Sequence, residues 1–212
     1  MDGNNRWSKK KNLNQYKGYS DGVNRLIKIT KHIFKNYDVK YISAFALSKN
    51  NLNRSERIIS TIKSVLLDFL NKYEENYNLN FKIKFIGDLN FLNKKIRDKI
   101  EIIENINLSS KNYLIILINY SGQYDIVNSL NSFNKSSKIN ENDILKKLYT
   151  KDFPNPDLLI RTGGFQRLSN FMLYQLAFTE LCFTKKLWPE LKNADIDRFI
   201  KNYYRIDRKF GL

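Results

Sequence analysis

The feature that most constrains the fold is the alternation of strand-like and helical hydrophobic patterns along the chain. Mainly apolar runs at 39–47 (VKYISAFAL), 113–118 (YLIILI) and 156–160 (PDLLI), with an alternating run at 79–85, are typical of strands. Helical stripes lie between them, formed by Val23, Leu26, Ile27, Ile33 and Phe34, by Ile58, Ile62, Val65, Leu66, Phe69, Leu70 and Tyr73, and by Ile96, Ile100, Ile103 and Ile106. Parallel strands need crossover connections, which are usually helices. The pattern therefore predicts an α/β domain with a mostly parallel central sheet and helices on both faces.

Length and composition favour one compact domain. With 212 residues, 42% of them hydrophobic, the chain can bury a sizeable core, and no linker divides it. No apolar run approaches the roughly 20 residues of a membrane-spanning helix. Residues 2–17 are polar overall, unlike a signal peptide, and the single cysteine, Cys182, suits a reducing compartment. These features predict a cytoplasmic protein, in which 131–142 (NSFNKSSKINEN) is the low-complexity patch.

The net charge of +16 indicates an anionic partner, such as nucleic acid, an acidic membrane surface or a phosphorylated small molecule. The alternative is a compositional bias, because lysine, asparagine and isoleucine are abundant over the whole chain. The arginines are scarcer than the lysines and therefore say more about a site.

The decapeptide RTGGFQRLSN at 161–170 follows a predicted strand and has the composition of a phosphate site. Arg161 and Arg167 flank a glycine pair, and Ser169 adds a hydroxyl group. Guanidinium groups bind phosphate oxygens two at a time, and glycines let backbone N–H groups approach an anion. In open α/β sheets ligands bind at the carboxyl ends of the strands. The alternative is an ordinary strand-to-helix turn with solvated arginines.

Three further loops are rich in polar groups. MDGNNRW at 1–7 combines a carboxylate, a glycine, amides and an arginine, which together can hold a divalent cation and a phosphate. SKNNLNR at 48–54 and NYSG at 119–122 each follow a predicted strand. Taken singly each is an ordinary polar loop, but loops at the carboxyl ends of parallel strands converge on one crevice.

The ordered set of these motifs resembles the cis-prenyltransferase family, and within it the bacterial undecaprenyl diphosphate synthases. The resemblance rests on MDGNNRW at 1–7, SKNNLNR at 48–54, IGDL at 86–89, NYSGQYDIV at 119–127, the block DLLIRTGGFQRLSNFMLYQLAFTELCFTKKLWPEL at 157–191, and RKFG at 208–211. It implies one α/β domain over 1–212 with a hydrophobic tunnel walled by the predicted helix at 58–73. It also implies Mg²⁺-dependent addition of isopentenyl diphosphate to an allylic diphosphate, such as farnesyl diphosphate, to give a polyprenyl diphosphate lipid carrier.

The resemblance assigns roles to individual residues. Asp2 and Glu180 are the implied Mg²⁺ carboxylates, with Glu180 near a dimer interface. Asn51, with Ser48, matches a group credited with assisting proton removal; because an amide is a poor base, we expect Asn51 to orient a diphosphate or the Asp2 side chain. The implied contacts of isopentenyl diphosphate are Arg161, Arg167, Leu168 and Ser169. Those of the allylic substrate are Gly3, Asn4, Asn5, Arg6, Trp7, Gln15, Tyr19, Ser48, Lys49, Asn50, Leu52 and Arg54.

The chain departs from the family pattern at several positions. Gln15 and Tyr19 stand in place of an arginine and a histidine, Leu52 replaces a tryptophan, Ile58 a glutamate, Phe165 an acidic residue and Gln123 an arginine. These departures predict reduced activity or an altered allylic substrate. In the family a hydrophobic strand precedes the first motif, which here starts at residue 1. Either the chain starts at an internal methionine or the sheet lacks a central strand, and we favour the first interpretation.

The implied partners are the two diphosphate substrates and a second copy of the chain in a homodimer. The lipid product implies peripheral contact with the inner face of the membrane, and we expect no nucleic-acid partner. Two alternatives stay open. One is a non-catalytic partner subunit of a heteromeric enzyme, suggested by the departures. The other is an RNA-binding module, suggested by the charge of +16 and the thirteen tyrosines, although no aromatic-basic RNA motif is present.

Overall fold

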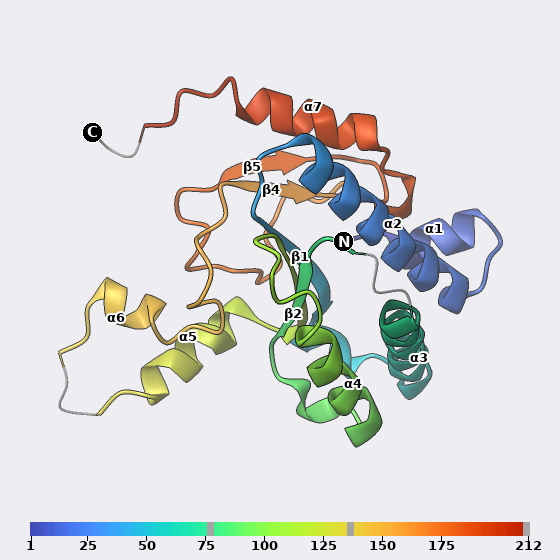
Figure 1. Cartoon of the computed structure of the whole chain (residues 1–212), viewed down its shortest axis with the longest axis horizontal. Helices are drawn as coiled ribbons and strands as arrows, with labels where there is room; N and C mark the ends of the chain where they lie inside the picture. The colour runs from blue at the N-terminus through green and yellow to red at the C-terminus, as the bar shows by residue number, and fades with distance from the viewer. Residues whose placement is uncertain (76–78, 135–137, 210–212) are drawn as a thin grey trace.

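The computed structural model describes residues 1–75, 79–134 and 138–209. Part of the low-complexity patch and the last two residues of the 208–211 motif lie outside the described residues. In chain order the elements, with short 3₁₀ helices written η, are α1 (Asn4–Lys10), α2 (Gln15–Asn36), β1 (Tyr41–Ser48), η1 (Lys49–Asn53), α3 (Glu56–Glu75), β2 (Lys82–Ile86), η2 (Leu89–Phe91), α4 (Lys94–Glu104), β3 (Tyr113–Tyr120), α5 (Gly122–Asn131), α6 (Glu141–Leu145), β4 (Leu158–Arg161), β5 (Glu180–Phe183), η3 (Trp188–Glu190) and α7 (Asn193–Tyr203) (Figure 1).

The strands pair in parallel, as the alternating pattern predicts. β3 lies between β1 and β2, with Tyr113 opposite both Tyr41 and Lys82. β4 and β5 form a second parallel sheet in which Leu158 pairs with Glu180. The sequence predicts one central sheet, whereas the strands of the described residues divide into two.

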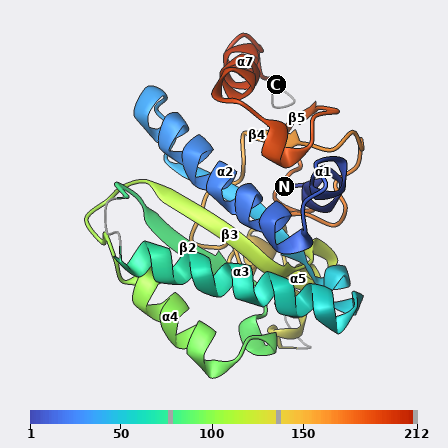
Figure 2. The same cartoon turned by 90° about the vertical axis from the view of Figure 1, so that its right-hand side faces the viewer.

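Helices cover one face of the three-stranded sheet. Leu114 and Ile116 of β3 point into a core with the apolar stripes of α2, α3 and α4. The helical residues buried there include Leu26, Ile29 and Ile33 of α2, Leu70 and Tyr73 of α3, and Ile96, Ile100 and Ile103 of α4. These three helices lie side by side across the sheet (Figure 2). The predicted stripes are therefore core-forming.

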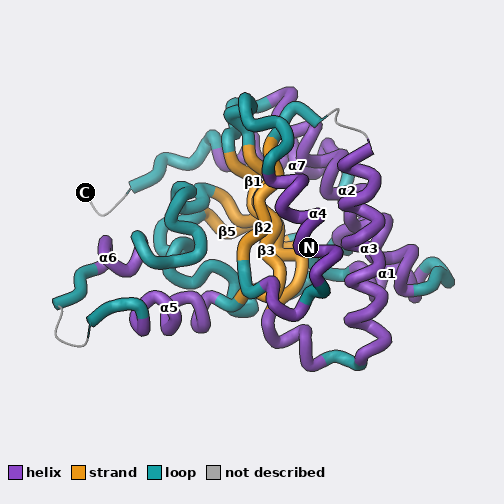
Figure 3. The backbone as a smooth tube through the Cα atoms, turned by 60° about the horizontal axis from the view of Figure 1, so that its bottom comes forward, coloured by secondary structure: helices purple, strands orange, loops and turns teal. Residues whose placement is uncertain are grey.

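The opposite face of this sheet packs against turns of the 149–176 segment. Ile115 and Leu117, which alternate with Leu114 and Ile116 along β3, contact a second core that includes Phe171, Met172 and Leu176. Loops, together with α5 and α6, occupy this side of the strands (Figure 3). Helices therefore lie on both sides of the sheet, but the apolar residues at 171–176 that pack on this face lie in turns, with Met172 at a positive φ of 41°.

A buried polar network fastens this second face. The Asp125 carboxylate accepts hydrogen bonds from the Tyr149 N–H at 2.8 Å and the Tyr120 hydroxyl at 2.9 Å. The Gln175 amide lies 3.5 Å from both Asp125 and Tyr120 and donates to the Thr150 hydroxyl at 2.7 Å. Burial raises the pKa of the Asp125 carboxyl, and these hydrogen bonds oppose the rise. Each polar group of this network has a hydrogen-bond partner, as buried polar groups in folded proteins generally do.

The first residues of the chain contact the middle of β1 and the residue that follows β4. The Met1 amino group donates to the Phe45 carbonyl at 3.4 Å, and the Asp2 N–H donates to the Thr162 hydroxyl at 3.0 Å.

No helix within the described ranges is long and apolar enough to cross a membrane.

Candidate active site

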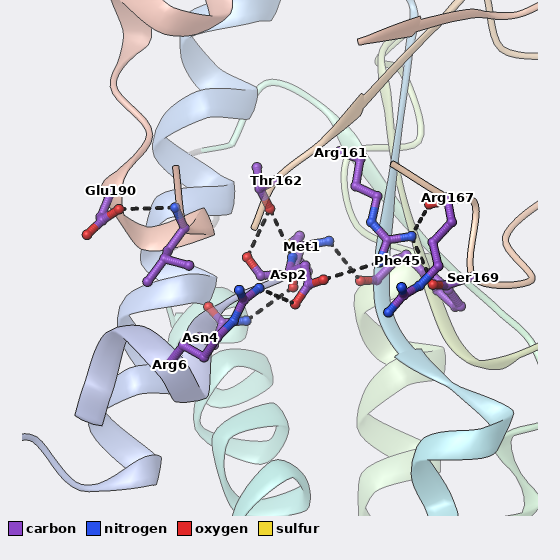
Figure 4. Close-up of polar contacts among 11 residues, drawn as sticks. Met1, Asp2, Asn4, Arg6, Phe45, Arg161, Thr162, Arg167, Ser169 and Glu190 are labelled. Carbon is purple, nitrogen blue, oxygen red and sulfur yellow. Dashed lines mark hydrogen bonds and ion pairs between the residues drawn. The ribbon is translucent and has the colours of Figure 1, made fainter. Parts of the chain in front are cut away.

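The centre of the site is the Asp2 carboxylate, held between two arginines. Arg6 Nη2 lies 3.3 Å from Asp2 Oδ1, and Arg161 Nη2 lies 3.3 Å from Asp2 Oδ2 (Figure 4). Arg6 comes from α1 and Arg161 from the end of β4. Both distances are longer than the roughly 2.7–2.9 Å of a tight charge-assisted hydrogen bond. With its side chain 36% exposed, the carboxylate is accessible to a ligand.

Hydrogen bonds to the backbone N–H and carbonyl of Asp2 hold this residue in place. The Thr162 hydroxyl accepts from the Asp2 N–H at 3.0 Å and donates to the Asp2 carbonyl at 2.9 Å, which also accepts from the Trp188 N–H at 2.9 Å. Gly3 then turns the chain into α1 at a φ of +105°, packed so closely on Leu187 that a Cβ atom would lie 2.8 Å from Leu187 Cδ2. The first motif therefore depends on segments that are distant in sequence.

A second set of hydrogen bonds joins Arg161 to the loop that follows β4. Arg161 Nη1 donates to the Ser169 hydroxyl at 2.9 Å and to the Arg167 carbonyl (Figure 4). Ser169 and Asn170 have positive φ angles of 51° and 64°. The Asn170 side chain holds this turn, because it accepts from the Gln123 N–H at 2.8 Å and donates to the Ser121 hydroxyl at 2.8 Å. The loops at 119–122 and 161–170 thus meet, as the parallel order predicts.

The backbone N–H groups of the glycine pair do not face an anion site, as the sequence predicts, but are already hydrogen-bonded. The Gly163 N–H donates to the Lys186 carbonyl at 2.8 Å, and the Gly164 N–H donates to the Thr184 carbonyl at 2.9 Å. These donors extend the β4–β5 pairing, so they are not available to an anion, and that part of the phosphate hypothesis is wrong. Gly163 instead leaves room for Arg6, since a Cβ atom would lie 2.4 Å from Arg6 Nη2.

The residues predicted to bind the allylic substrate lie on α1, α2 and η1. The Gln15 amide donates to Asn5 Oδ1 at 3.2 Å, and Arg54 Nη1 donates to the Tyr19 hydroxyl at 3.4 Å. Asn4 Nδ2 donates to the Met1 carbonyl at 3.4 Å, while its buried Oδ1 has no hydrogen-bond partner in the described part of the chain. These contacts join the first motif to α2 through Gln15, and join α2 to the 48–54 motif through Tyr19.

Other predicted residues are more dispersed. Asn51 lies in η1 with Ser48, Lys49 and Asn50 beside it, and no side-chain hydrogen bond joins Asn51 to Asp2 in the described ranges. Lys49 Nζ lies 3.1 Å from the centre of the Tyr124 ring. Leu52 packs on the helical core and Leu168 on the second core. Trp7 lies half-buried on α1. The roles of these residues toward substrate stay predictions.

The two predicted metal carboxylates lie at opposite ends of the β4–β5 pair, because Glu180 is opposite Leu158 at the start of β4 and Asp2 contacts Thr162 just after the end of β4. Glu180 opens β5, and its backbone N–H donates to the Asp157 carbonyl at 3.0 Å. Within the described ranges no three histidine, cysteine or acidic side chains gather as a metal site. A single accessible carboxylate still fits Mg²⁺, which is commonly bound by one or two carboxylates together with substrate phosphates.

Burial and hydrogen bonding shift two pKa values beside the site. Burial lowers the pKa of the Met1 amino group to about 6, with Arg161 adding to the effect and Asp2 opposing it. The Leu187 N–H, which donates to Glu190 at 3.1 Å, lowers the pKa of the Glu190 carboxyl, and Lys10 adds to this. Glu190 therefore stays ionised and holds the turn that packs on Gly3.

Sequence reasoning missed two supports of the site. Thr162 binds both backbone groups of Asp2, and the segment from Leu187 to Trp188 packs on Gly3 and binds the Asp2 carbonyl. The one available signal was the position of Thr162 between Arg161 and the glycine pair. Leu187 and Trp188 carry no local signal, because their role depends on tertiary contacts.

Comparison with known proteins identifies the family. A family model described as putative undecaprenyl diphosphate synthase matches residues 1–211. The chain belongs to this family. An isoprenyl transferase from Fusobacterium nucleatum is 38% identical over 216 residues, covering 100% of this chain and 93% of the relative. A Pyrobaculum aerophilum relative, named tritrans,polycis-undecaprenyl-diphosphate synthase (geranylgeranyl-diphosphate specific), is 34% identical and covers 99% of this chain and 92% of its own length.

Solved structures agree with the family assignment. Lavandulyl diphosphate synthase from Lavandula x intermedia, in complex with dimethylallyl diphosphate, is 31% identical with a TM-score of 0.91, covering 100% of this chain and 95% of that one. A probable undecaprenyl diphosphate synthase from Campylobacter jejuni is 30% identical with a TM-score of 0.77, covering 91% of this chain and 93% of that one. This member of the undecaprenyl diphosphate synthase family is therefore a prenyltransferase with the cis-prenyltransferase fold. The predictions of family, α/β fold and enzyme class are confirmed.

Proposed function

We propose that this prenyltransferase adds isopentenyl diphosphate units to an allylic diphosphate in a Mg²⁺-dependent reaction and so makes a polyprenyl diphosphate. The observation that carries the proposal is the Asp2 carboxylate between Arg6 and Arg161, 3.3 Å from each. In each cycle the allylic carbon–oxygen bond breaks and releases diphosphate, a carbon–carbon bond forms to the isopentenyl unit, and the released diphosphate takes up the proton that this unit loses. Two diphosphates must therefore lie close together, which requires converging cations.

The two arginines divide the substrates between them. Arg6, with Asn4 and Asn5 beside it on α1, faces the side predicted for the allylic diphosphate. Arg161 connects to Ser169 and to the Arg167 backbone on the side predicted for isopentenyl diphosphate. A guanidinium fork binds two phosphate oxygens at once and stabilises charge on a departing diphosphate.

Asp2 is the residue that would hold Mg²⁺, with the diphosphate oxygens completing its ligands. The long contacts to both arginines support this, since neither locks the carboxylate. A bound Mg²⁺ supplies neutralisation of the charge that develops on the leaving diphosphate. We assign Glu180 as the second carboxylate, contributed across a homodimer, because Glu180 and Asp2 lie at opposite ends of the β4–β5 pair.

The allylic substrate we propose is farnesyl diphosphate. The growing chain would run along α3, whose half-buried Ile62, Leu66 and Phe69 pack against the helical core. Two relatives are named for, or bound to, different prenyl diphosphates, so a substrate test includes the dimethylallyl, farnesyl and geranylgeranyl forms. The lipid product would bring the enzyme to the membrane surface from the cytoplasm.

A second candidate is a partner subunit with little activity of its own. It is favoured by Gln15 and Tyr19, which place neutral side chains against Asn5 and Arg54 where the family resemblance implies cations. Retention of Asp2, Arg6, Arg161 and Ser169 favours catalysis.

The assignment of the substrates is tested by Arg161→Ala with Arg6→Ala as its matched partner. Arg161→Ala should raise the KM for isopentenyl diphosphate tenfold or more, because a charge-assisted contact contributes about 1.5–3 kcal/mol, and should change the allylic KM far less. Arg6→Ala should show the opposite pattern. Equal effects of either variant on both substrates would contradict the division, and an inactive parent chain would favour the partner subunit.

A further inference from the structure

Three arginines converge on one aromatic ring beside Asp2. The guanidinium carbons of Arg6, Arg161 and Arg167 lie 5.1, 5.7 and 4.2 Å from the centre of the Phe165 ring. All three distances fall within the roughly 6 Å range of cation–π attraction. The arginines come from α1, the end of β4 and the loop after it, so Phe165 joins segments that are separate in the chain.

Local backbone geometry places the ring there. Gly163 and Gly164 have φ angles of +89° and +85°, and their N–H groups pair with the 184–186 segment. This turn places the Phe165 ring near Arg6 and Arg161, and the absence of a side chain at Gly163 leaves room for Arg6. The Phe165 residue remains 40% exposed, although an apolar ring of this size is usually buried.

The charges around the ring are not balanced. Asp2 pairs with Arg6 and Arg161, and within the described ranges no ion pair reaches Arg167. Three guanidinium charges against one carboxylate leave a formal excess of two positive charges. Such groups repel one another, and an aromatic ring attracts each of them without neutralising any.

We propose that Phe165 is a positioning residue that holds the three arginines together in the free enzyme. Because the ring does not neutralise the guanidinium groups, their positive charge stays available to a bound diphosphate. This inference rests on the proposed function and extends it. A bound diphosphate meets guanidinium groups that are already gathered, so less ordering accompanies binding. A carboxylate at this position would pair with one arginine and remove part of the charge on which the ligand depends.

Inorganic pyrophosphate is the probe, titrated calorimetrically at low and high salt into the intact chain. Phe165→Leu removes the ring and keeps an apolar side chain, so we expect binding about fivefold to thirtyfold weaker. Phe165→Tyr keeps the ring and should bind within about twofold of the parent. Phe165→Glu should bind more weakly than Phe165→Leu and show a smaller loss with salt, because it lowers the local charge. Equal binding by the parent and Phe165→Leu would overturn the proposal.

A second readout separates this inference from the proposed function. In the ligand-free protein, the Nε–Hε NMR signals of Arg6, Arg161 and Arg167 should be shifted by the ring in the parent and in Phe165→Tyr, and should move toward ordinary positions in Phe165→Leu. Signals that do not respond to removal of the ring would overturn the proposal that Phe165 holds the three arginines together. If the parent chain shows ring-shifted signals but fails to bind pyrophosphate, the proposed function is contradicted, whereas the contact between Phe165 and the three arginines is confirmed.

Discussion

At the level of single residues, the site depends on side chains and on the space left where a side chain is missing. Gly163 and Gly164 have similar positive φ angles, +89° and +85°, yet their surroundings differ. A Cβ atom at Gly163 would lie 2.4 Å from Arg6 Nη2, whereas at Gly164 the nearest atom is 3.9 Å away. The pair therefore offers its own control, because the backbone strain is shared and the clash is not.

Gly163→Ala and Gly164→Ala should each lose about 1 kcal/mol or more of stability, since both place a side chain at positive φ. Only Gly163→Ala should also raise the KM for the allylic diphosphate, by displacing Arg6. Thermal unfolding and steady-state kinetics on both variants check this. A KM raised equally in the two variants would mean that Arg6 is not held by the space at Gly163.

At the level of elements, α7 is tied to α2 through one carboxylate. Asp197 Oδ1 lies 2.6 Å from His32 Nε2 and accepts from the Tyr37 hydroxyl at 2.7 Å. The hydrogen bond with His32, followed by that from Tyr37, lowers the pKa of the Asp197 carboxyl. A lowered pKa means that the folded chain binds fewer protons, so the stabilisation is complete above the ordinary value of 3.8 and is lost as the pH falls through the lowered one.

Asp197→Asn should therefore reduce the free energy of unfolding at neutral pH, by at most about 1 kcal/mol because the pair is partly exposed. The difference from the parent should shrink as the pH falls below about 4. Urea unfolding of both proteins at several pH values measures it. A difference that stays constant with pH would show that the carboxylate charge does not contribute.

The elements also show what the sequence can and cannot predict. The alternation of Leu114 and Ile116 with Ile115 and Leu117 makes β3 a strand buried on both faces, and the stripes of α2, α3 and α4 need no tertiary information. Neither α1, which lacks a clear apolar stripe, nor the four-residue strand β5 was predicted. The glycine pair was assigned the wrong role because its N–H partners, at 184–186, lie about twenty residues away in the chain.

At the level of the whole molecule, the site forms where the two sheets approach each other. Met1 contacts Phe45 within β1 and Asp2 contacts Thr162 just after β4, so the start of the chain joins strands from both sheets. The predicted convergence of Asp2 with Arg161 and Ser169 is present in the structure. The roles of Asn51 in orienting a diphosphate or the Asp2 side chain, and of Glu180 as a second Mg²⁺ carboxylate, stay predictions.

The role of Asp2 can be tested by incorporation of radiolabelled isopentenyl diphosphate into lipid by the parent chain, Asp2→Asn and Asp2→Ala, with farnesyl diphosphate and with or without Mg²⁺. We expect long-chain product only from the parent with Mg²⁺, a loss of a hundredfold or more in both variants, and pyrophosphate binding that survives in both because the arginines remain. Incorporation by Asp2→Ala at the parent rate, or by the parent in the absence of any divalent cation, would contradict it.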